Sequence, residues 1–369
     1  MALATVASQM RKGIPLPWNV RTESGHLLLA RGQVLATEED IEALLARGMF
    51  VDAAELRLSS GGEVAPLYRN VFERWAAMER RLAALLRSPS ADLGPKIVEL
   101  ADSVTELADA HADQLIFAVV QYDHSRFAAY GVAHALHVAA VCALLTRRTE
   151  CPPEQRQSLL CAAMTMNIAI VDLQGRLAAQ GVRPTSSQRK LIDTHPFDSA
   201  DRLRQSGVLD ELWLQLVEEH HEQPGGLGYP RGLNKPCELA WMLRLVDIFT
   251  AKYAARADRP ALPARIAAQQ LFVQSGQDPV AAMLIKEFGM YPPGCLVKLG
   301  NGETAVVVRR GAQVNQPIAA VFINRNGDPV APPLRRDTAR SDCAVVSTLT
   351  PESILVRLAV EQLYESGEI

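Results

Sequence analysis

Hydrophobic residues recur with two different periods along this chain of 369 residues. From about residue 66 to 287 they return every three or four positions, in alanine- and leucine-rich runs such as 69–87 and 96–120. That period is typical of amphipathic helices that bury one face. Proline-containing breaks separate the runs at Ser88-Pro89-Ser90, Cys151-Pro152-Pro153 and Arg183-Pro184. The pattern predicts a helical domain over residues 66–288.

The pattern changes to alternating apolar residues after the sequence Gly-Met-Tyr-Pro-Pro-Gly at 289–294. Apolar runs at 295–299 and 304–308 flank Asn301-Gly302, which is a strong signal for a β-hairpin. A third run at 318–323 predicts another strand of the same antiparallel sheet. Thr350 followed by Pro351 predicts the start of a final helix. Residues 289–369 therefore read as a small β extension with a terminal helix.

Residues 1–65 form a third region. The segments Gly25-His26-Leu27-Leu28-Leu29 and Met49-Phe50-Val51 predict short strands. Thr37 is suited to start a helix over 38–47 that Gly48 ends. We expect a small α+β module here. The predicted fold is therefore mainly α, with a helical domain between an N-terminal α+β module and a C-terminal antiparallel β extension.

Composition excludes several classes of protein. A formal net charge of −3 argues against a general DNA- or RNA-binding protein. We find no run of about 18 apolar residues and no signal-peptide pattern, so we expect a soluble cytoplasmic protein without a membrane span. The 6 cysteines show no CxxC spacing, which does not support a zinc finger.

Candidate chemistry is concentrated at His220-His221, which is followed by Glu-Gln-Pro-Gly-Gly-Leu-Gly-Tyr-Pro. Neutral imidazole is the commonest nitrogen ligand of transition metals, although histidine is also favourable at a helix end in its own right. Glycines at 225, 226 and 228 allow backbone conformations closed to other residues, so that a polyanionic ligand can come close. The combination favours a metal and phosphate site.

This loop, with Gly226, Gly228, Tyr229 and Pro230, resembles the signature of the HD-GYP family of cyclic di-GMP phosphodiesterases. The resemblance covers about 120–300 and implies a helical HD-type domain. It implies five metal ligands and two arginines that recognise phosphate or guanine. The ligands are His134, His195, His220, His221 and Asp247, and the arginines are Arg256 and Arg259.

The chain departs from the family pattern on one helix and in the loop. Active members carry a His-Asp dyad with a lysine three residues after the aspartate, and here Met166, Asn167 and Ile170 take these three positions. Gly225 replaces an aspartate of the loop. Asparagine lacks the charge that bridges two cations, and methionine is a poor ligand for Fe(II), Mn(II) or Mg(II). Each loss should slow turnover on the order of 10²-fold or more.

The remaining ligands leave two alternatives: one divalent metal such as iron or manganese at an incomplete site, or no metal. The other histidines are interpreted as structural. His137 lies on the helix of His134, whereas His26, His111 and His124 have no partner at ligand spacing.

We expect a degenerate member that binds cyclic di-GMP or a partner protein, with weak or no hydrolysis. One alternative is an active metal-dependent phosphodiesterase that produces pGpG and GMP. Another is an interaction module whose loop contacts a diguanylate cyclase (GGDEF) domain. The segment 69–120 either packs on its own domain or supports a homodimer.

Overall fold

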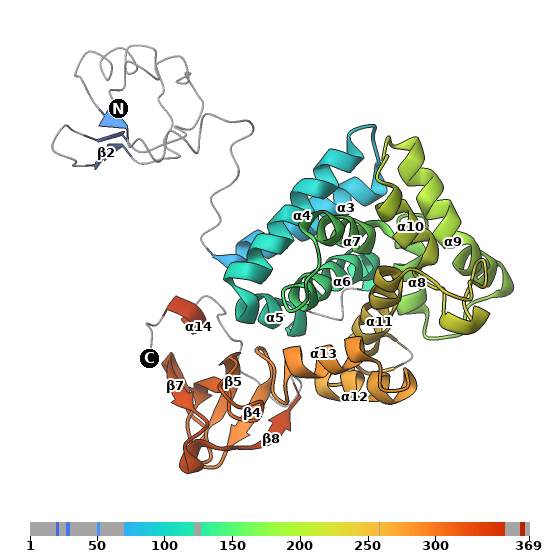
Figure 1. Cartoon of the computed structure of the whole chain (residues 1–369). Coiled ribbons are helices and arrows are strands. Elements are labelled where there is room, and N and C mark those ends of the chain that lie inside the picture. The colour runs from blue at the N-terminus through green and yellow to red at the C-terminus, as the bar shows by residue number, and fades with distance from the viewer. Residues whose placement is uncertain are drawn as a thin grey trace. The chain divides into compact units, whose positions relative to one another are not determined.

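The computed structural model describes residues 20–21, 27–29, 50–51, 70–121, 127–257, 259–350 and 362–365. Contacts divide the chain into two units, Met1–Tyr68 and Arg69–Ile369, which are described separately (Figure 1). The predicted domain boundaries near residues 65 and 288 remain predictions.

The first unit contains a three-stranded antiparallel sheet in the order β2-β1-β3. Its strands are β1 (Val20–Arg21), β2 (Leu27–Leu29) and β3 (Phe50–Val51). Strands β2 and β3 lie within the segments expected to be strands, 25–29 and 49–51, whereas β1 was not predicted. The helix expected over 38–47 lies outside the described residues.

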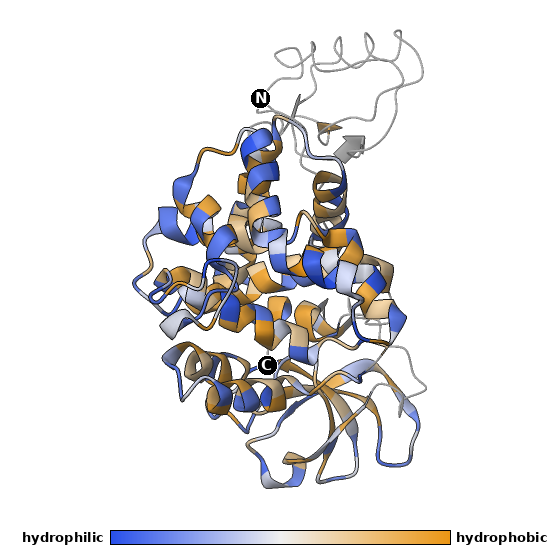
Figure 2. Cartoon of the chain, turned by 90° about the vertical axis from the view of Figure 1, so that its right-hand side faces the viewer, coloured by the Kyte–Doolittle hydropathy of each residue, from blue (hydrophilic) through white to orange (hydrophobic). Residues whose placement is uncertain are grey.

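The second unit is mainly helical, as predicted. Its outer helices contain both hydrophilic and hydrophobic residues (Figure 2). Its helices in chain order are α3 (Val71–Arg87), α4 (Leu93–Ala110), α5 (Ala112–Val120), α6 (Tyr130–Thr146), α7 (Pro153–Thr165), α8 (Val171–Gln180), α9 (Ser186–Gln205), α10 (Glu211–Glu219), α11 (Glu238–Tyr253), α12 (Ala264–Gln274), α13 (Pro279–Phe288) and α14 (Gln362–Glu365).

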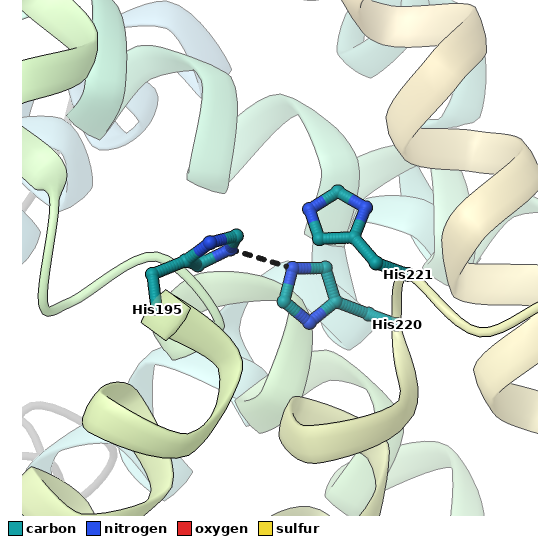
Figure 3. A group of neighbouring side chains, drawn as sticks. All are labelled: His195, His220 and His221. Atoms are coloured by element: carbon teal, nitrogen blue, oxygen red, sulfur yellow. Dashed lines mark hydrogen bonds between the residues drawn. The ribbon is translucent and has the colours of Figure 1, made fainter. Parts of the chain in front are cut away.

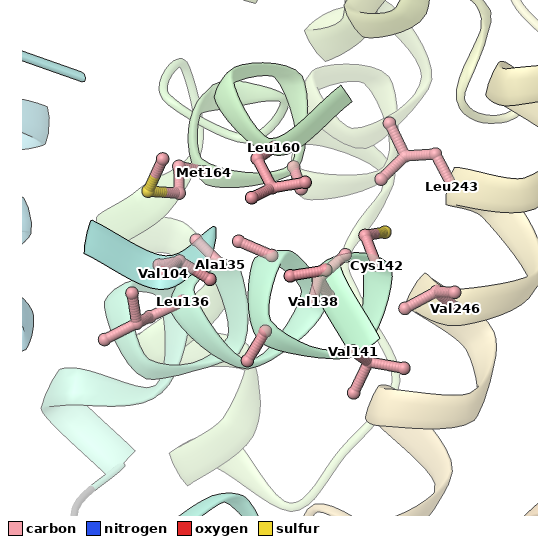
Figure 4. Packing of buried hydrophobic residues seen from close by; sticks show 14 of the residues in the cluster. Val104, Ala135, Leu136, Val138, Val141, Cys142, Leu160, Met164, Leu243 and Val246 are labelled. Atoms are coloured by element: carbon pink, nitrogen blue, oxygen red, sulfur yellow. The ribbon is translucent and has the colours of Figure 1, made fainter. Parts of the chain in front are cut away.

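Helix α6 is the centre of this unit, because every one of its 17 residues is buried. Val138, Val141 and Cys142 of α6 pack with residues of α4, α7 and α11 in one continuous core (Figure 4). By length and composition the segment Phe127–Thr146 could cross a membrane, but 89% of its most apolar window is buried inside the fold. Its apolar character is that of a helix surrounded by other helices.

The run predicted as one stretch over 96–120 is two helices. His111 lies between α4 and α5 with a non-helical backbone, and its N–H bonds to the carbonyl of Leu107. This exposed residue does not belong to the apolar stripe, so the chain can turn there. Trp75, Ile97 and Leu115 of the segment 69–120 lie in the main core. The segment therefore packs on its own domain, and a homodimer remains a prediction.

The sheet of the second unit has five antiparallel strands in the order β7-β6-β5-β4-β8. They are β4 (Leu296–Leu299), β5 (Thr304–Arg309), β6 (Ile318–Ile323), β7 (Pro329–Asp337) and β8 (Val345–Leu349). The predicted hairpin is confirmed, since Leu296 lies opposite Val306 across the Asn301-Gly302 turn. One face packs against Phe117 and Leu363. Most of the predicted helix after Thr350 lies outside the described residues.

Glu287 joins the helices to the sheet. Its carboxylate is fully buried at the end of α13 and accepts hydrogen bonds from Arg148, just after α6, and from Arg310, just after β5, the latter at 2.6 Å. Arg310 also donates to Asp113 of α5. Two guanidinium groups thus compensate the cost of burying one carboxylate.

Replacing Glu287 by alanine should lower the free energy of unfolding by roughly 3–5 kcal/mol, because two arginines would lose a buried partner. The measurement is urea unfolding followed by helical circular dichroism. The matched control is Glu106→Ala. Glu106 pairs with Arg74 at 2.5 Å, but its side chain is 66% exposed, so its loss should cost no more than about 1 kcal/mol. Equal losses in the two variants would contradict this role of Glu287.

Candidate metal and nucleotide site

Three of the predicted ligands, His195, His220 and His221, form one cluster (Figure 3). His195 comes from the middle of α9, which starts at a capping box formed by Thr185 and Gln188. His220 and His221 follow α10 directly, where the chain leaves the helix. The possible ligand atoms of the three histidines all lie within 4.8 Å of one another.

Backbone carbonyls orient two of these rings. Nδ1 of His195 lies 2.6 Å from the carbonyl oxygen of Ile192, and Nδ1 of His220 lies 2.6 Å from that of Val217. Each Nδ1 must therefore carry the proton, which assigns the neutral tautomer with a free lone pair on Nε2. The two Nε2 atoms face each other at 3.0 Å. Two lone pairs at this distance repel unless a cation lies between them.

This separation suits a shared metal ion. Metal–nitrogen bonds of 2.0–2.1 Å with a tetrahedral angle place two ligand nitrogens about 3.3 Å apart. Burial lowers the pKa of His220 to about 3, and it also lowers the pKa values of His195 and His221. The charge of a neighbouring histidine lowers the pKa further at His220 and His221. The three rings are thus neutral, which is the form that binds metals.

The remaining two predicted ligands are bonded to each other beside this cluster. Nε2 of His134 on α6 lies 2.7 Å from Oδ1 of Asp247 on α11. Burial opposes ionisation of Asp247, but the hydrogen bond from His134 and the nearby histidines outweigh it and hold its pKa below the usual range. The ring of His134 stacks on Tyr130, with the centroids 5.6 Å apart. Its Nδ1 is buried and has no hydrogen-bond partner in the described structure.

The two predicted nucleotide-binding arginines differ in surroundings. Arg256 donates to the hydroxyl of Tyr130 at 3.0 Å and lies over that ring, so it borders the pair of His134 and Asp247. Arg259 donates to the carbonyl of Ala251 in the last turn of α11. Only Arg256 therefore contacts a residue next to a candidate ligand.

The signature loop is built around a buried carboxylate that was not predicted. Glu222 is 1% exposed and accepts hydrogen bonds from the backbone N–H groups of Arg231, Gly232 and Leu233, at 2.6, 3.2 and 2.8 Å. A side chain at Gly228 would come within 2.4 Å of the backbone of Glu222, so only glycine fits there. The only available signal was that Glu222 directly follows the two histidines.

The other loop residues frame His221. The ring of Tyr229 stacks on that of His221 with the centroids 4.5 Å apart. The backbone N–H of Tyr229 donates to the carbonyl oxygen of His221 at 3.3 Å. Pro230 follows Tyr229 at the loop exit. Gly225 and Gly226 have positive φ angles of 79° and 75°, which favour glycine. The space around Gly225 is open.

A cation that the sequence did not indicate also borders the cluster. Nη1 of Arg244, one helical turn before Asp247, lies 3.4 Å from the His221 carbonyl oxygen and 3.5 Å from His221 Nδ1. Burial lowers the pKa of Arg244. It has no carboxylate within ion-pair distance among the described residues. No local motif singles out this arginine, because only packing brings α11 beside the loop.

The residues in place of the dyad lie in the turn between α7 and α8. Met166 is fully buried in the core, and Asn167 and Ile170 are 6% and 8% exposed. The turn is bonded to α9, since the N–H of Ala169 donates to Ser199 Oγ at 3.2 Å. The segment 166–170 contains no ionisable side chain.

The histidines interpreted as structural lie apart from the cluster where they are described. His137 is buried and stacks between Trp75 at 5.8 Å and Tyr253 at 6.4 Å, and its structural role remains a prediction. His111 is exposed at the junction of α4 and α5. His26 and His124 lie outside the described residues.

Comparisons with known proteins agree with the signature loop. Residues 98–280 match the model of the HD domain family. The cyclic di-GMP phosphodiesterase PA4108 of Pseudomonas aeruginosa is 28% identical over 197 residues, which are 51% of this chain and 48% of the relative. The match thus spans about half the length of that curated relative.

A solved structure, of Bd1817, a HDG"Y"P protein from Bdellovibrio bacteriovorus, is similar with a TM-score of 0.49 and 15% sequence identity. It covers 76% of this chain and 95% of that one. The residues matched by the family model include the signature loop, and both lie in the helical unit. Residues 98–280 of this chain therefore form an HD domain, and the chain is similar to the cyclic di-GMP phosphodiesterase PA4108.

Proposed function

We propose that this chain is a degenerate HD-GYP protein of cyclic di-GMP signalling, soluble in the cytoplasm, which binds the nucleotide or a partner protein and hydrolyses the nucleotide weakly or not at all. The composition of the histidine cluster carries the proposal. Three neutral imidazoles lie together, while the turn bonded to α9 contains Met166 and Asn167 where the family pattern has a histidine and an aspartate. A bridging carboxylate is what a second metal ion would need.

The cluster fits one divalent metal ion, such as Fe(II) or Mn(II). His195, His220 and His221 offer neutral nitrogen donors, and the facing lone pairs of His195 and His220 favour a cation over an empty pocket. A metal bound there would supply positive charge and Lewis acidity toward a phosphate group. His134 and Asp247 bond to each other and would support the site from the side.

Arginines at the edge of the site support the choice of a phosphate-containing ligand. Arg256 borders His134 through Tyr130, and Arg244 borders His221. Guanidinium groups form paired, charge-assisted hydrogen bonds with phosphate oxygens. Arg259 bonds to the end of α11, so we assign it a supporting role for the segment that carries Arg256.

Two alternatives remain as proposals. An active phosphodiesterase would need the surviving ligands to build a working centre without the dyad and the lysine. An interaction module for GGDEF domains would use the tip of the signature loop. The exposure of Leu227, whose side chain at the tip is 78% exposed, favours such an interaction module. Tyr229 packs on His221 instead.

Wild-type protein should bind cyclic di-GMP in a calorimetric titration and leave it unchanged after incubation with Mn(II) or Fe(II), as checked by chromatography for pGpG and GMP. Arg256→Gln should weaken binding roughly 10- to 100-fold, the worth of a hydrogen bond to a charged group. The control is Arg265→Gln on α12, where Arg265 contacts Gln269 at 3.5 Å. Metal-dependent formation of pGpG or GMP would favour the active phosphodiesterase. If cyclic di-GMP does not bind, the proposed nucleotide-binding role is wrong.

The metal content of the wild-type protein should approach one equivalent of Mn(II) in a titration followed by electron paramagnetic resonance. His220→Ala should weaken Mn(II) binding by more than the roughly 10- to 100-fold typical of losing a residue outside the ligand set. His111→Ala changes an exposed histidine and should have no effect. Two equivalents in the wild type, or unchanged binding in His220→Ala, would contradict a single site at the cluster.

Restoring the dyad should create a place for a second metal ion, because it adds a neutral nitrogen donor and a bridging carboxylate. Met166→His combined with Asn167→Asp should therefore raise the Mn(II) content above that of the wild type. Met166→Leu keeps an apolar side chain of similar volume in the core and serves as the control. If the double variant folds and its metal content does not rise, the assignment of 166–167 to the dyad is wrong.

A further inference from the structure

A second site is suggested by a cavity of about 260 Å³ in the helical unit. It lies among the end of α3, the start of α8, the residues of α9 on either side of His195, and the turn that precedes α8. The lining residues used below are Arg87, Arg176, Arg202, Asp172, Ile170 and Leu191. None of the candidate metal ligands lines it.

The charges of this arginine cleft are unbalanced. Three arginines face one aspartate, whereas the whole chain has a formal charge of −3. Arg87 pairs with Asp172 at 3.2 Å, but this aspartate side chain is 61% exposed and the pair is weakly held. Arg202 donates to the carbonyl oxygen of Ile168 at 3.3 Å. Among the described residues, neither Arg176 nor Arg202 has a carboxylate within ion-pair distance.

The rest of the cleft is apolar. Ile168, Ile170 and Leu173 are buried side chains that contribute to its wall. Leu191 is 49% exposed and extends this apolar surface toward solvent. An apolar wall beside a cluster of cations suits a ligand that has an anionic end and a flat or aliphatic body.

Another cavity of the same unit lacks this imbalance. It lies near the start of α7, and its charged lining residues are two arginines and two aspartates: Arg147, Arg156, Asp102 and Asp109. Both arginines pair with Asp109, Arg156 at 3.0 Å and Arg147 at 3.5 Å. Its charges are therefore neutralised within the protein, unlike those of the arginine cleft.

We propose that the arginine cleft binds a small phosphomonoester of mononucleotide size, with the phosphate held by Arg176 and Arg202 and the body against Ile170 and Leu191. Guanidinium groups match the geometry of phosphate oxygens. The volume lies just below the 300–1,000 Å³ of pockets for drug-sized ligands, so it cannot enclose a cyclic dinucleotide. This site does not depend on the function proposed for the histidine cluster.

The test is calorimetric titration of the full chain with GMP as the probe. GMP should bind, and inorganic phosphate and guanosine should each bind at least tenfold more weakly, because each lacks one half of the ligand. Arg176→Gln and Arg202→Gln should each weaken GMP binding roughly 10- to 100-fold. Raising the salt concentration should weaken it as well, since the site is open to solvent.

The matched control is Arg80→Gln, because Arg80 is exposed two turns before Arg87 on α3 and is not part of the cleft. This variant should bind GMP as the wild type does, and circular dichroism checks that all variants are folded. Absence of GMP binding overturns the proposal, and so does binding that both cleft variants leave unchanged. Inorganic phosphate that binds as tightly as GMP also overturns it, because the apolar wall would then contribute nothing.

Discussion

The burial of α6 on every side is the constraint on which the helical unit depends. A helix with no exposed face must have apolar neighbours all round, and α4, α7 and α11 supply them. Besides Thr146, whose hydroxyl bonds to the carbonyl of Cys142 in the same helix, its polar exceptions are two histidines. His134 bonds to Asp247 of α11, and His137 stacks between Trp75 and Tyr253, so both polar rings acquire partners inside the core. One edge of the candidate site is thereby fixed by core packing.

Buried carboxylates fix the other edge. Glu222 holds the signature loop by accepting three backbone N–H groups, and Glu219 accepts the N–H of Cys237 at the start of α11. Glu218 accepts hydrogen bonds from Arg204 and Arg231. These contacts hold the chain on both sides of His220 and His221, so the two rings are oriented before any ligand arrives. Such a preorganised frame serves binding as well as catalysis.

The balance of charge distinguishes this site from a site that binds two metal ions. Its donors are mostly neutral imidazoles, Asp247 is engaged by His134, and Arg244 and Arg256 lie at the border. Positive charge from the protein favours an anionic ligand and disfavours a second divalent ion. The single-metal and nucleotide-binding parts of the proposal thus have one electrostatic origin.

The local pattern of the sequence determined most of the elements. Periods of three to four residues predicted the helices, and the Asn301-Gly302 turn between alternating runs predicted the β4–β5 hairpin, because both patterns reflect backbone geometry within a few residues. His220 and His221 were likewise found from the two adjacent imidazoles and the glycine-rich loop, whereas His195 was indicated only by the resemblance to the HD-GYP family. The break of the run 96–120 at His111 was not found, since a helical period continues across one exposed residue.

Tertiary structure decided how these residues are grouped. It divided the five expected ligands into a cluster of three and the pair of His134 and Asp247. It also brought Arg244 beside His221, gave Glu222 its three backbone donors, and gathered arginines of α3, α8 and α9 around one cavity. The sequence alone determines which side chains are available and which local conformations they favour. Which distant side chains meet depends on how the helices pack around α6, which is not a local property of the chain.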